Sequence, residues 1–141
     1  MDSLLTFCAA AGSCMKASTR EWVLKAEEDF LAASALNLRR KKPLWNIVAF
    51  HVQQTVEKYL KARLEEAGLG IPKTHDLLHL LNLVAAVEPL WAAYHSAFSS
   101  LVSYAVQTRY PGNSVTKADA RHAVKLCRQF RKEARRALGL R

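Results

Sequence analysis

Apolar residues recur along the chain at spacings of three and four positions, and no stretch alternates with the period of two that marks a half-buried strand. This pattern predicts five helical segments, at about residues 19–38, 43–67, 74–87, 89–108 and 116–138. Short connections between long amphipathic helices favour antiparallel neighbours. We therefore predict an all-α, up-and-down bundle of four or five helices.

The first four predicted helices each have a start signal in the sequence. Ser18 and Glu21 predict a capping box at the start of the first helix. Pro43 suits the first position of the second helix, where a missing N–H costs nothing. Thr74 is expected to cap the third helix with its hydroxyl group, and Pro89 suits the start of the fourth.

The last predicted helix is amphipathic and strongly basic. Thr116 and Asp119 predict a capping box at its start, and Gly139 predicts its end. Its expected core face consists of Ala120, Ala123, Cys127, Phe130, Ala134 and Leu138. Residues 117–141 hold nine Lys or Arg against two acidic residues, so they carry +7 of the formal net charge of +9. Such a segment attracts phosphates, although a solvated helix face that confers solubility has the same composition.

Composition and length indicate one globular domain. Half of the 141 residues are hydrophobic and 23% are charged, which is typical of a folded chain and not of a disordered one. The three cysteines have no CxxC spacing, so they favour a reducing, cytoplasmic compartment over a disulfide framework or a zinc site. No apolar run approaches the ~18 residues of a membrane span. We expect residues 1–14 to be a disordered extension or a mis-assigned start before Met15, which leaves one domain over residues 15–141.

The second predicted helix carries a stripe of polar residues. At 100° per residue, an arc of about 80° holds His51, Gln54, Lys58 and Lys61, with Glu57 just beside it. The opposite face, expected in the core, consists of Trp45, Val48, Val52, Val56, Tyr59 and Leu60. One imidazole, one amide and two ammonium groups can hold an anion by charge and hydrogen bonds. The alternative is an ordinary solvent-exposed face, stabilised by a Glu57–Lys61 pair four residues apart.

Four sequence elements resemble the motifs of the HEPN domain family. Residues 50–62, FHVQQTVEKYLKA, resemble its FHxQQxxEKxLKA signature. Asp29 resembles the aspartate of the AxxDL element in the first helix, with Phe30 in place of the usual leucine. Residues 74–77 resemble THDL, and residues 104–111 resemble YxxxxRYP. The elements occur in the order found in the family and cover most of the chain.

This resemblance implies a helical bundle that commonly forms homodimers. Such proteins are often produced beside a minimal nucleotidyltransferase, in pairs regarded as toxin–antitoxin-like. Some are metal-independent ribonucleases, and others bind nucleotides or act as the helical companion of the transferase. The ribonuclease branch carries an Arg followed after four to six residues by His. Here the next His after Arg109 is His122, and no other Arg and His have that spacing. The resemblance therefore does not imply ribonuclease activity for this chain.

The resemblance also implies a polar site for a nucleotide or RNA phosphate, with no metal and no cofactor. Its residues are Asp29, His51, Gln54, Lys58, Lys61, His75, Arg109 and Tyr110. In this hypothesis the lysines and Arg109 neutralise phosphate, while Gln54 and Tyr110 contact base or sugar. One alternative is a divergent ribonuclease that uses His51 or His75 with Arg109 across a dimer. Another is a dimerisation and partner-binding scaffold, in which the same polar residues only set the helix register.

Two further patterns are interpreted as structural. His75 and His79 lie four residues apart on a predicted helix, but no third ligand is evident, so we predict no metal site. The three tryptophans lie at core spacing, and we expect them to pack inside and not to stack on bases.

Overall fold

The computed structural model describes residues 15–141, and the predicted extension at residues 1–14 lies outside this part. Over the described residues the chain is helical and forms no strand, which confirms the all-α prediction. The elements are α1 (Ala17–Asn37), α2 (Trp45–Glu66), α3 (Leu77–Val84), the 3₁₀ segment η1 (Pro89–Tyr94), α4 (His95–Gln107) and α5 (Lys117–Ala137). None of these helices is long and apolar enough to cross a membrane.

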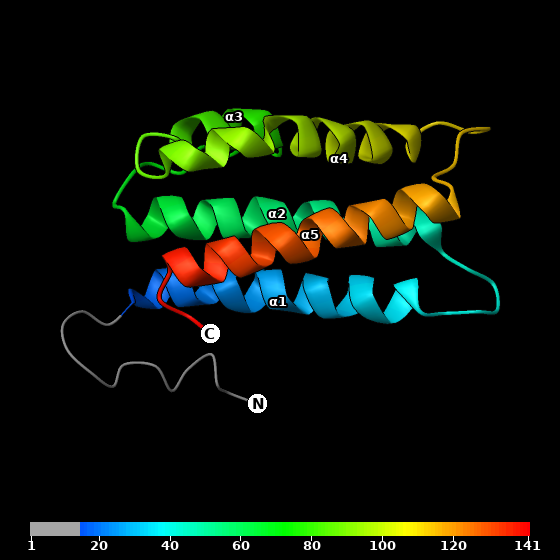
Figure 1. Ribbon diagram of the computed structural model, residues 1–141, viewed down its shortest axis with the longest axis horizontal. Helices are drawn as coiled ribbons and strands as arrows, with labels where there is room; N and C mark the ends of the chain where they lie inside the picture. The colour runs from blue at the N-terminus through cyan, green and yellow to red at the C-terminus, as the bar shows by residue number, and fades with distance from the viewer. Residues whose placement is uncertain (1–14) are drawn as a thin grey trace.

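The long helices α1, α2, α4 and α5 lie side by side and alternate in direction along the chain (Figure 1). α2 is central, because it contacts α1, α3, α4 and α5. α1 flanks α2 on one side, and α3 and α4 flank it on the other (Figure 1). α5 packs across α1 and α2, and the resulting architecture is an up-and-down bundle.

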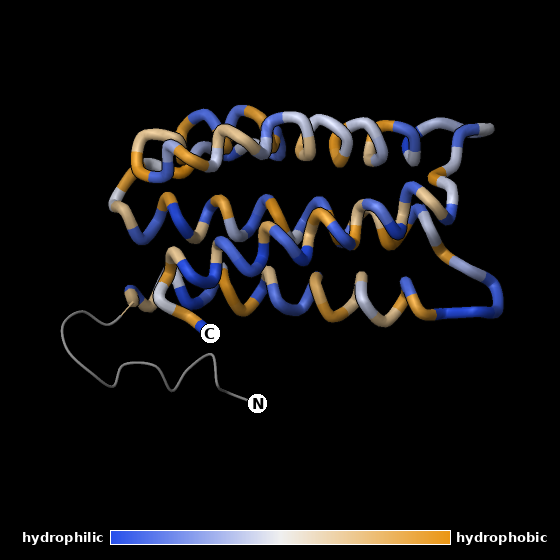
Figure 2. The backbone as a smooth tube through the Cα atoms, viewed as in Figure 1, coloured by the Kyte–Doolittle hydropathy of each residue, from blue (hydrophilic) through white to orange (hydrophobic). Residues whose placement is uncertain are grey.

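The hydrophobic core uses the helix faces that the sequence periodicity predicts. On α2 the buried side chains include Val48, Val52, Val56, Tyr59 and Leu60. All six residues of the predicted core face of α5 are buried as well. Figure 2 shows hydrophobic positions recurring along each helix and a hydrophilic turn between α1 and α2. The 3.6-residue period therefore predicts these core faces, but it does not predict that α2 also buries polar residues on its other side, among them Gln53, Glu57 and Lys61.

Aromatic rings fill the space between η1, α4 and α5. Phe130 contacts Trp91 and Phe98 edge to face, and the ring centroids are 5.0 Å apart in both pairs. Such pairs add about 0.5–1.5 kcal/mol to the burial of apolar area. Trp91 is buried as expected, whereas Trp22 and Trp45 pack against the core with part of their surface exposed.

The predicted capping box at the start of α1 is wrong. Lys16 is the N-cap residue, and Ser18 donates its hydroxyl to Glu65 Oε1 at 2.7 Å instead of capping its own helix. The backbone N–H of Lys16 donates to Glu66 Oε1 at 3.0 Å. Carboxylates from the end of α2 therefore satisfy the start of α1, and this long-range partnership has no local sequence motif.

Other predicted helix boundaries are displaced by a few residues. Asp76 caps α3 in place of Thr74, because its carboxylate accepts from two N–H groups of the first turn at 3.0 and 3.3 Å. Pro43 precedes α2, which begins at Trp45. α3 ends at Val84, and the predicted fourth helix divides into η1 and α4.

Both predicted ends of α5 are confirmed. Thr116 Oγ1 accepts from the N–H of Asp119 at 3.1 Å, and the Asp119 carboxylate accepts from the N–H of Thr116 at 3.4 Å. Gly139 adopts a φ of +74°, which other residues rarely adopt. Its N–H donates to the carbonyl of Arg136 at 3.0 Å, as in a Schellman motif.

Candidate functional site

Asp29 is a buried carboxylate that α1 presents to α2. Its Oδ1 lies 2.7 Å from Nδ1 of His51, and its Oδ2 lies 2.5 Å from Nζ of Lys58. His51 and Lys58 are two helical turns apart on α2, so both side chains face α1. Each oxygen of Asp29 therefore has a partner, and the cluster joins α1 to the centre of the bundle.

Glu57 forms a second carboxylate-centred cluster, toward the segment that precedes α3. Its side chain is 3% exposed, and its Oε1 lies 2.7 Å from Nδ1 of His75. Lys61 Nζ lies 4.0 Å from Oε2 of the same carboxylate and 5.4 Å from the centre of the Trp22 ring. The predicted Glu57–Lys61 pair therefore exists, but both side chains are buried and do not form a solvent-exposed pair.

The predicted polar stripe of α2 thus divides into two clusters. One is centred on Asp29 and the other on Glu57, and each contains one carboxylate, one imidazole and one ammonium group. With a neutral imidazole, each cluster has no net charge. Lys58 and Lys61 are therefore already compensated inside the protein, which reduces their attraction for a phosphate.

His75 borders an open hollow of about 490 Å³ between α4 and the start of α3. The hollow is lined by Gln53, His75, Asp76, Leu78, Val102, Ala105, Val106 and Arg109. The imidazole is 79% exposed although its Nδ1 contacts the buried Glu57, so Nε2 remains available to a ligand. Arg109 is exposed, and its guanidinium has no hydrogen bond or ion pair with any of residues 15–141.

Gln53, which also lines this hollow, carries an acceptor that no other described residue satisfies. The residue is 8% exposed, and its Nε2 donates weakly to the carbonyl of His75 at 3.5 Å. Its Oε1 is buried and has no hydrogen-bond partner in the part of the chain that the structure describes. An unpaired buried amide oxygen is costly, and the N–H or O–H group of a ligand would satisfy it.

The remaining predicted site residues lie apart from this hollow. Gln54 is half-buried on α2, one position beyond Gln53, and is not among the lining residues. Tyr110 is 61% exposed in the turn after α4 and is likewise not among them. The structure therefore brings His75 and Arg109 together in one place, and Asp29, His51 and Lys58 in another.

Two residues of this arrangement, Gln53 and Glu57, could not be identified as important from the sequence. Gln53 was part of the matched motif, but its angular position on α2 is outside the polar arc. Glu57 was placed beside the arc, with Lys61 as its expected partner. The partner that orients Glu57 toward the hollow is His75, which lies 18 residues later and on another segment. The spacing of residues within the motif therefore could not predict the pairing of Glu57 with His75.

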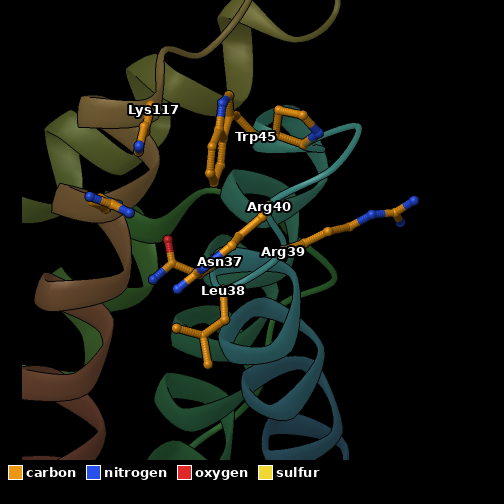
Figure 3. A pocket seen from close by; sticks show the side chains of 8 residues that line it. Asn37, Leu38, Arg39, Arg40, Trp45 and Lys117 are labelled. Atoms are coloured by element: carbon orange, nitrogen blue, oxygen red, sulfur yellow. The ribbon is translucent and has the colours of Figure 1, made fainter.

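A second open hollow lies where the end of α1 meets the start of α5. Its volume is about 610 Å³, and its lining includes Asn37, Arg40, Trp45, Lys117 and Arg121. Figure 3 shows Arg40 and Lys117 extending toward this space, with the Trp45 ring beside it. Four cationic residues and no acidic residue line the hollow, so it is strongly positive.

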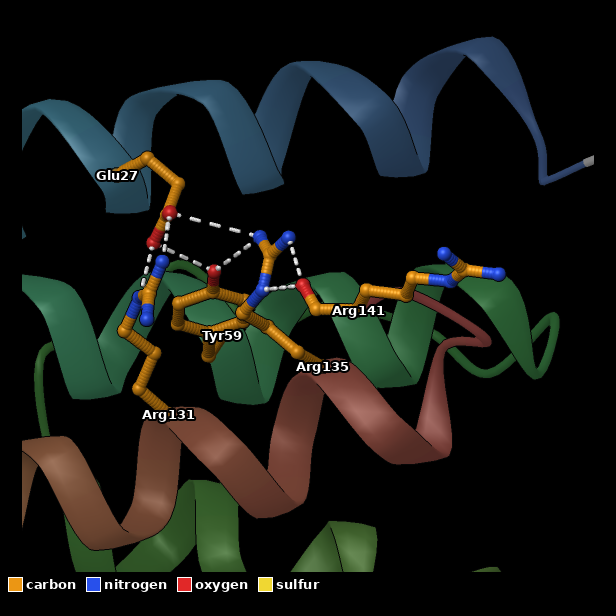
Figure 4. Close-up of polar contacts among 5 residues, drawn as sticks. All are labelled: Glu27, Tyr59, Arg131, Arg135 and Arg141. Carbon is orange, nitrogen blue, oxygen red and sulfur yellow. Dashed lines mark hydrogen bonds and ion pairs between the residues drawn. The ribbon is translucent and has the colours of Figure 1, made fainter. Parts of the chain in front are cut away.

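A third polar cluster, centred on Glu27, ties the helices together (Figure 4). Arg131 donates to both Glu27 oxygens at 2.7 and 2.5 Å, and the Tyr59 hydroxyl donates to Oε2 at 2.7 Å. Arg135 donates to Glu27 at 3.4 Å and to the carbonyl oxygen of Arg141. Burial by itself would raise the pKa of Glu27, but these hydrogen bonds and the two guanidinium charges outweigh it and lower the pKa. The cluster joins α1, α2, α5 and the C-terminal residue.

Within residues 15–141, no three His, Cys, Asp or Glu side chains lie near enough to one another to share a metal ion. The HEPN domain family matches residues 19–137, which is most of the chain. The protein therefore belongs to the HEPN family. Neither a curated protein nor a solved structure matches the chain.

Proposed function

We propose that this HEPN protein is a cytoplasmic nucleotide- or RNA-binding module that acts with a minimal nucleotidyltransferase in a toxin–antitoxin-like pair. The observation that supports the proposal best is the hollow beside α4. Its lining includes the exposed imidazole of His75 together with two residues that have unpaired groups within residues 15–141, the guanidinium of Arg109 and Oε1 of Gln53. These are three groups with free capacity for a charged, hydrogen-bonding ligand.

Each of these groups suits one part of a nucleotide. The fork of the Arg109 guanidinium binds two phosphate oxygens, which a single ammonium group does less specifically. Gln53 Oε1 accepts a hydrogen bond from a base amino group or a ribose hydroxyl. His75 Nε2 is the remaining ring nitrogen, because Nδ1 contacts Glu57. In this proposal Lys58 and Lys61 maintain the clusters around Asp29 and Glu57, and Arg109 provides the phosphate contact.

A thermal-shift screen of nucleotides and short RNAs tests the proposal. A ligand at 100 times its Kd stabilises the native state by about 2.7 kcal/mol, which raises the melting temperature by several degrees. We expect one ligand class to give this shift in the wild type and Arg109→Ala to abolish it. Lys25→Ala, which removes an exposed cation from α1, is the matched control and should keep the shift. No shift with any nucleotide or RNA would contradict the proposal.

One observation favours a second candidate function, a divergent metal-independent ribonuclease. The buried Glu57 orients an exposed imidazole and leaves its Nε2 free, an arrangement suited to proton transfer at a hydroxyl group. Arg109 borders the same hollow and can stabilise the charge that develops on a phosphate. Incubation of total RNA with the protein in EDTA tests this function. Cleavage that persists in both His75→Ala and Arg109→Ala would reject this catalytic assignment.

We also propose that the protein is a homodimer formed through the exposed side of α2. Leu44, Ile47 and Phe50 are 38%, 43% and 51% exposed along the first turns of this helix and the residue before it. Exposed apolar side chains that lie close together along a helix mark interaction surfaces. If the polar clusters proved to be structural only, this surface would support the alternative of a dimerisation and partner-binding scaffold.

A further inference from the structure

The side of α5 that faces solvent beside α1 carries a row of cations. The row consists of Lys117, Arg121, Lys125, Arg128 and Lys132, all of which are exposed. At a rise of 1.5 Å per residue, neighbouring members are about 5–6 Å apart and the row is about 22 Å long. The spacings of three and four residues keep all five on one face of the helix.

Few negative charges compensate this row. No member forms an ion pair or side-chain hydrogen bond with another residue of the described chain. Asp119, the acidic residue nearest its start, is engaged in the capping box with Thr116. Glu27, across the groove on α1, is already paired with Arg131 and Arg135. The row is therefore a continuous positive surface, and the inward arginines of α5 do not contribute to it.

The row begins at the hollow that contains Trp45. Lys117 and Arg121 belong to both, and Arg40 adds a cation from the turn after α1 (Figure 3). The Trp45 ring packs against the core but is partly exposed here, contrary to the expectation that the tryptophans pack inside. Asn37 contributes an amide whose Oδ1 is buried and has no hydrogen-bond partner among residues 15–141. A volume of about 610 Å³ is large enough for one nucleotide.

We infer that this surface binds single-stranded RNA, with the phosphate backbone along the cations of α5 and one base in the hollow beside Trp45. Phosphates would lie on the cation row, the base would stack on the indole, and a base amino group would donate to Asn37 Oδ1. The inference rests on the proposed RNA-binding function and extends it to a second site, because this hollow shares no residue with the one beside Arg109.

The chemistry of the hollow favours a single nucleic-acid strand over an acidic peptide or a duplex. An acidic peptide would use the cations but has no planar base to stack on Trp45. A duplex keeps its bases paired and stacked, so it cannot insert one beside the indole without local unpairing. An unpaired strand satisfies the cation row, the exposed ring and the free amide oxygen together.

The test is fluorescence anisotropy of a labelled 12-nucleotide RNA over a series of salt concentrations. Lys117→Gln/Arg121→Gln should weaken binding at least tenfold and make the slope of log K against log salt shallower by about 1.4, because each contact with a single strand contributes about 0.7. Trp45→Leu should weaken binding about tenfold and leave that slope unchanged. The control Lys25→Gln/Lys73→Gln removes the same charge from exposed positions elsewhere and should change affinity less than twofold.

The variants also separate this inference from the proposed function. Full RNA affinity in Lys117→Gln/Arg121→Gln, with loss in Arg109→Ala, would overturn the inference and leave the hollow beside Arg109 as the binding site. An equal loss in the control pair would also overturn it, since only net charge would then matter. Competition by poly-glutamate or anionic vesicles as strong as that by unlabelled RNA would overturn the choice of RNA. Circular dichroism of each variant verifies the helical fold.

Discussion

The imidazole of His75 lies 2.7 Å from the carboxylate of Glu57, and the two side chains differ widely in exposure, at 79% and 3%. A buried carboxylate from the central helix therefore orients an exposed ring on the segment before α3. Hydrogen bonding at one ring nitrogen determines how the other is presented. The pairing connects the interior of the bundle to the hollow that Arg109 borders.

Glu57→Gln should weaken ligand binding in that hollow. The amide keeps the size of the side chain but removes the charge that holds His75 and compensates Lys61. We expect a loss of about tenfold in nucleotide or RNA affinity and of about 1–3 kcal/mol in the free energy of unfolding. Titration of the folded protein and urea denaturation measure the two effects. Glu28→Gln, at an exposed position of α1, is the control. Unchanged affinity in Glu57→Gln would show that ligand binding does not depend on the orientation of His75.

Asp29 and Lys58 should be coupled energetically without contributing to ligand binding. Their side chains are 12% and 21% exposed, and removal of either leaves a polar partner without compensation. A double-mutant cycle of Asp29→Ala and Lys58→Ala in urea should give a coupling energy of about 1 kcal/mol or more. The affinity of the folded fraction should stay within twofold of the wild type. A tenfold loss of affinity in Lys58→Ala would instead place this lysine in the binding site.

The Glu27 cluster should make stability depend on pH in the acidic range. The pKa of Glu27 is lower in the folded protein than its ordinary value of 4.5, so ionised Glu27 favours folding. This contribution is complete above the unfolded pKa and is lost as the pH falls through the lower, folded pKa. The difference in unfolding free energy between wild type and Glu27→Gln should be about 1–3 kcal/mol at pH 7 and shrink below about pH 4.5. A difference that is constant from pH 7 to pH 2 would contradict this account.

The thiol of Cys127 should be unreactive in the native protein. Burial raises its pKa to about 12, so the thiolate that reacts with alkylating agents is scarce at pH 8. We expect peptide mass spectrometry to show little alkylation of Cys127 by iodoacetamide in buffer and rapid alkylation in urea. Labelling at the same rate in both conditions would mean that the core around this residue opens readily.

Phe50→Glu should convert a homodimer into monomers. Phe50 is 51% exposed on α2, and its ring lies 5.3 Å from that of His51, centre to centre. A carboxylate there would require desolvation in an apolar interface. Size-exclusion chromatography with light scattering measures the mass of both proteins, and Leu90→Glu, at an exposed position of η1, is the control. A wild type that is monomeric at high concentration would reject the dimer itself.

Much of the bundle could be predicted because its signals are local. The period of 3.6 residues identified the buried faces of α2 and α5, and the Thr116–Asp119 capping box lies within four residues. The predictions that Ser18 and Thr74 cap their helices were wrong because other side chains compete, one far along the chain and one only two residues away. Ser18 bonds to Glu65 at the end of α2, and Asp76 lies closer to the first turn of α3.

The sequence by itself determined the helices, their core faces and the concentration of charge on α5, since each depends on neighbours within a few residues. Only the tertiary structure decided which polar groups are compensated and which are free. It paired Lys58 with Asp29, paired His75 with Glu57, and left Arg109 and Gln53 Oε1 beside one hollow. These pairings depend on how helices dock against one another, because a side chain on α2 can meet α1 or α3 with only a small rotation of the helix.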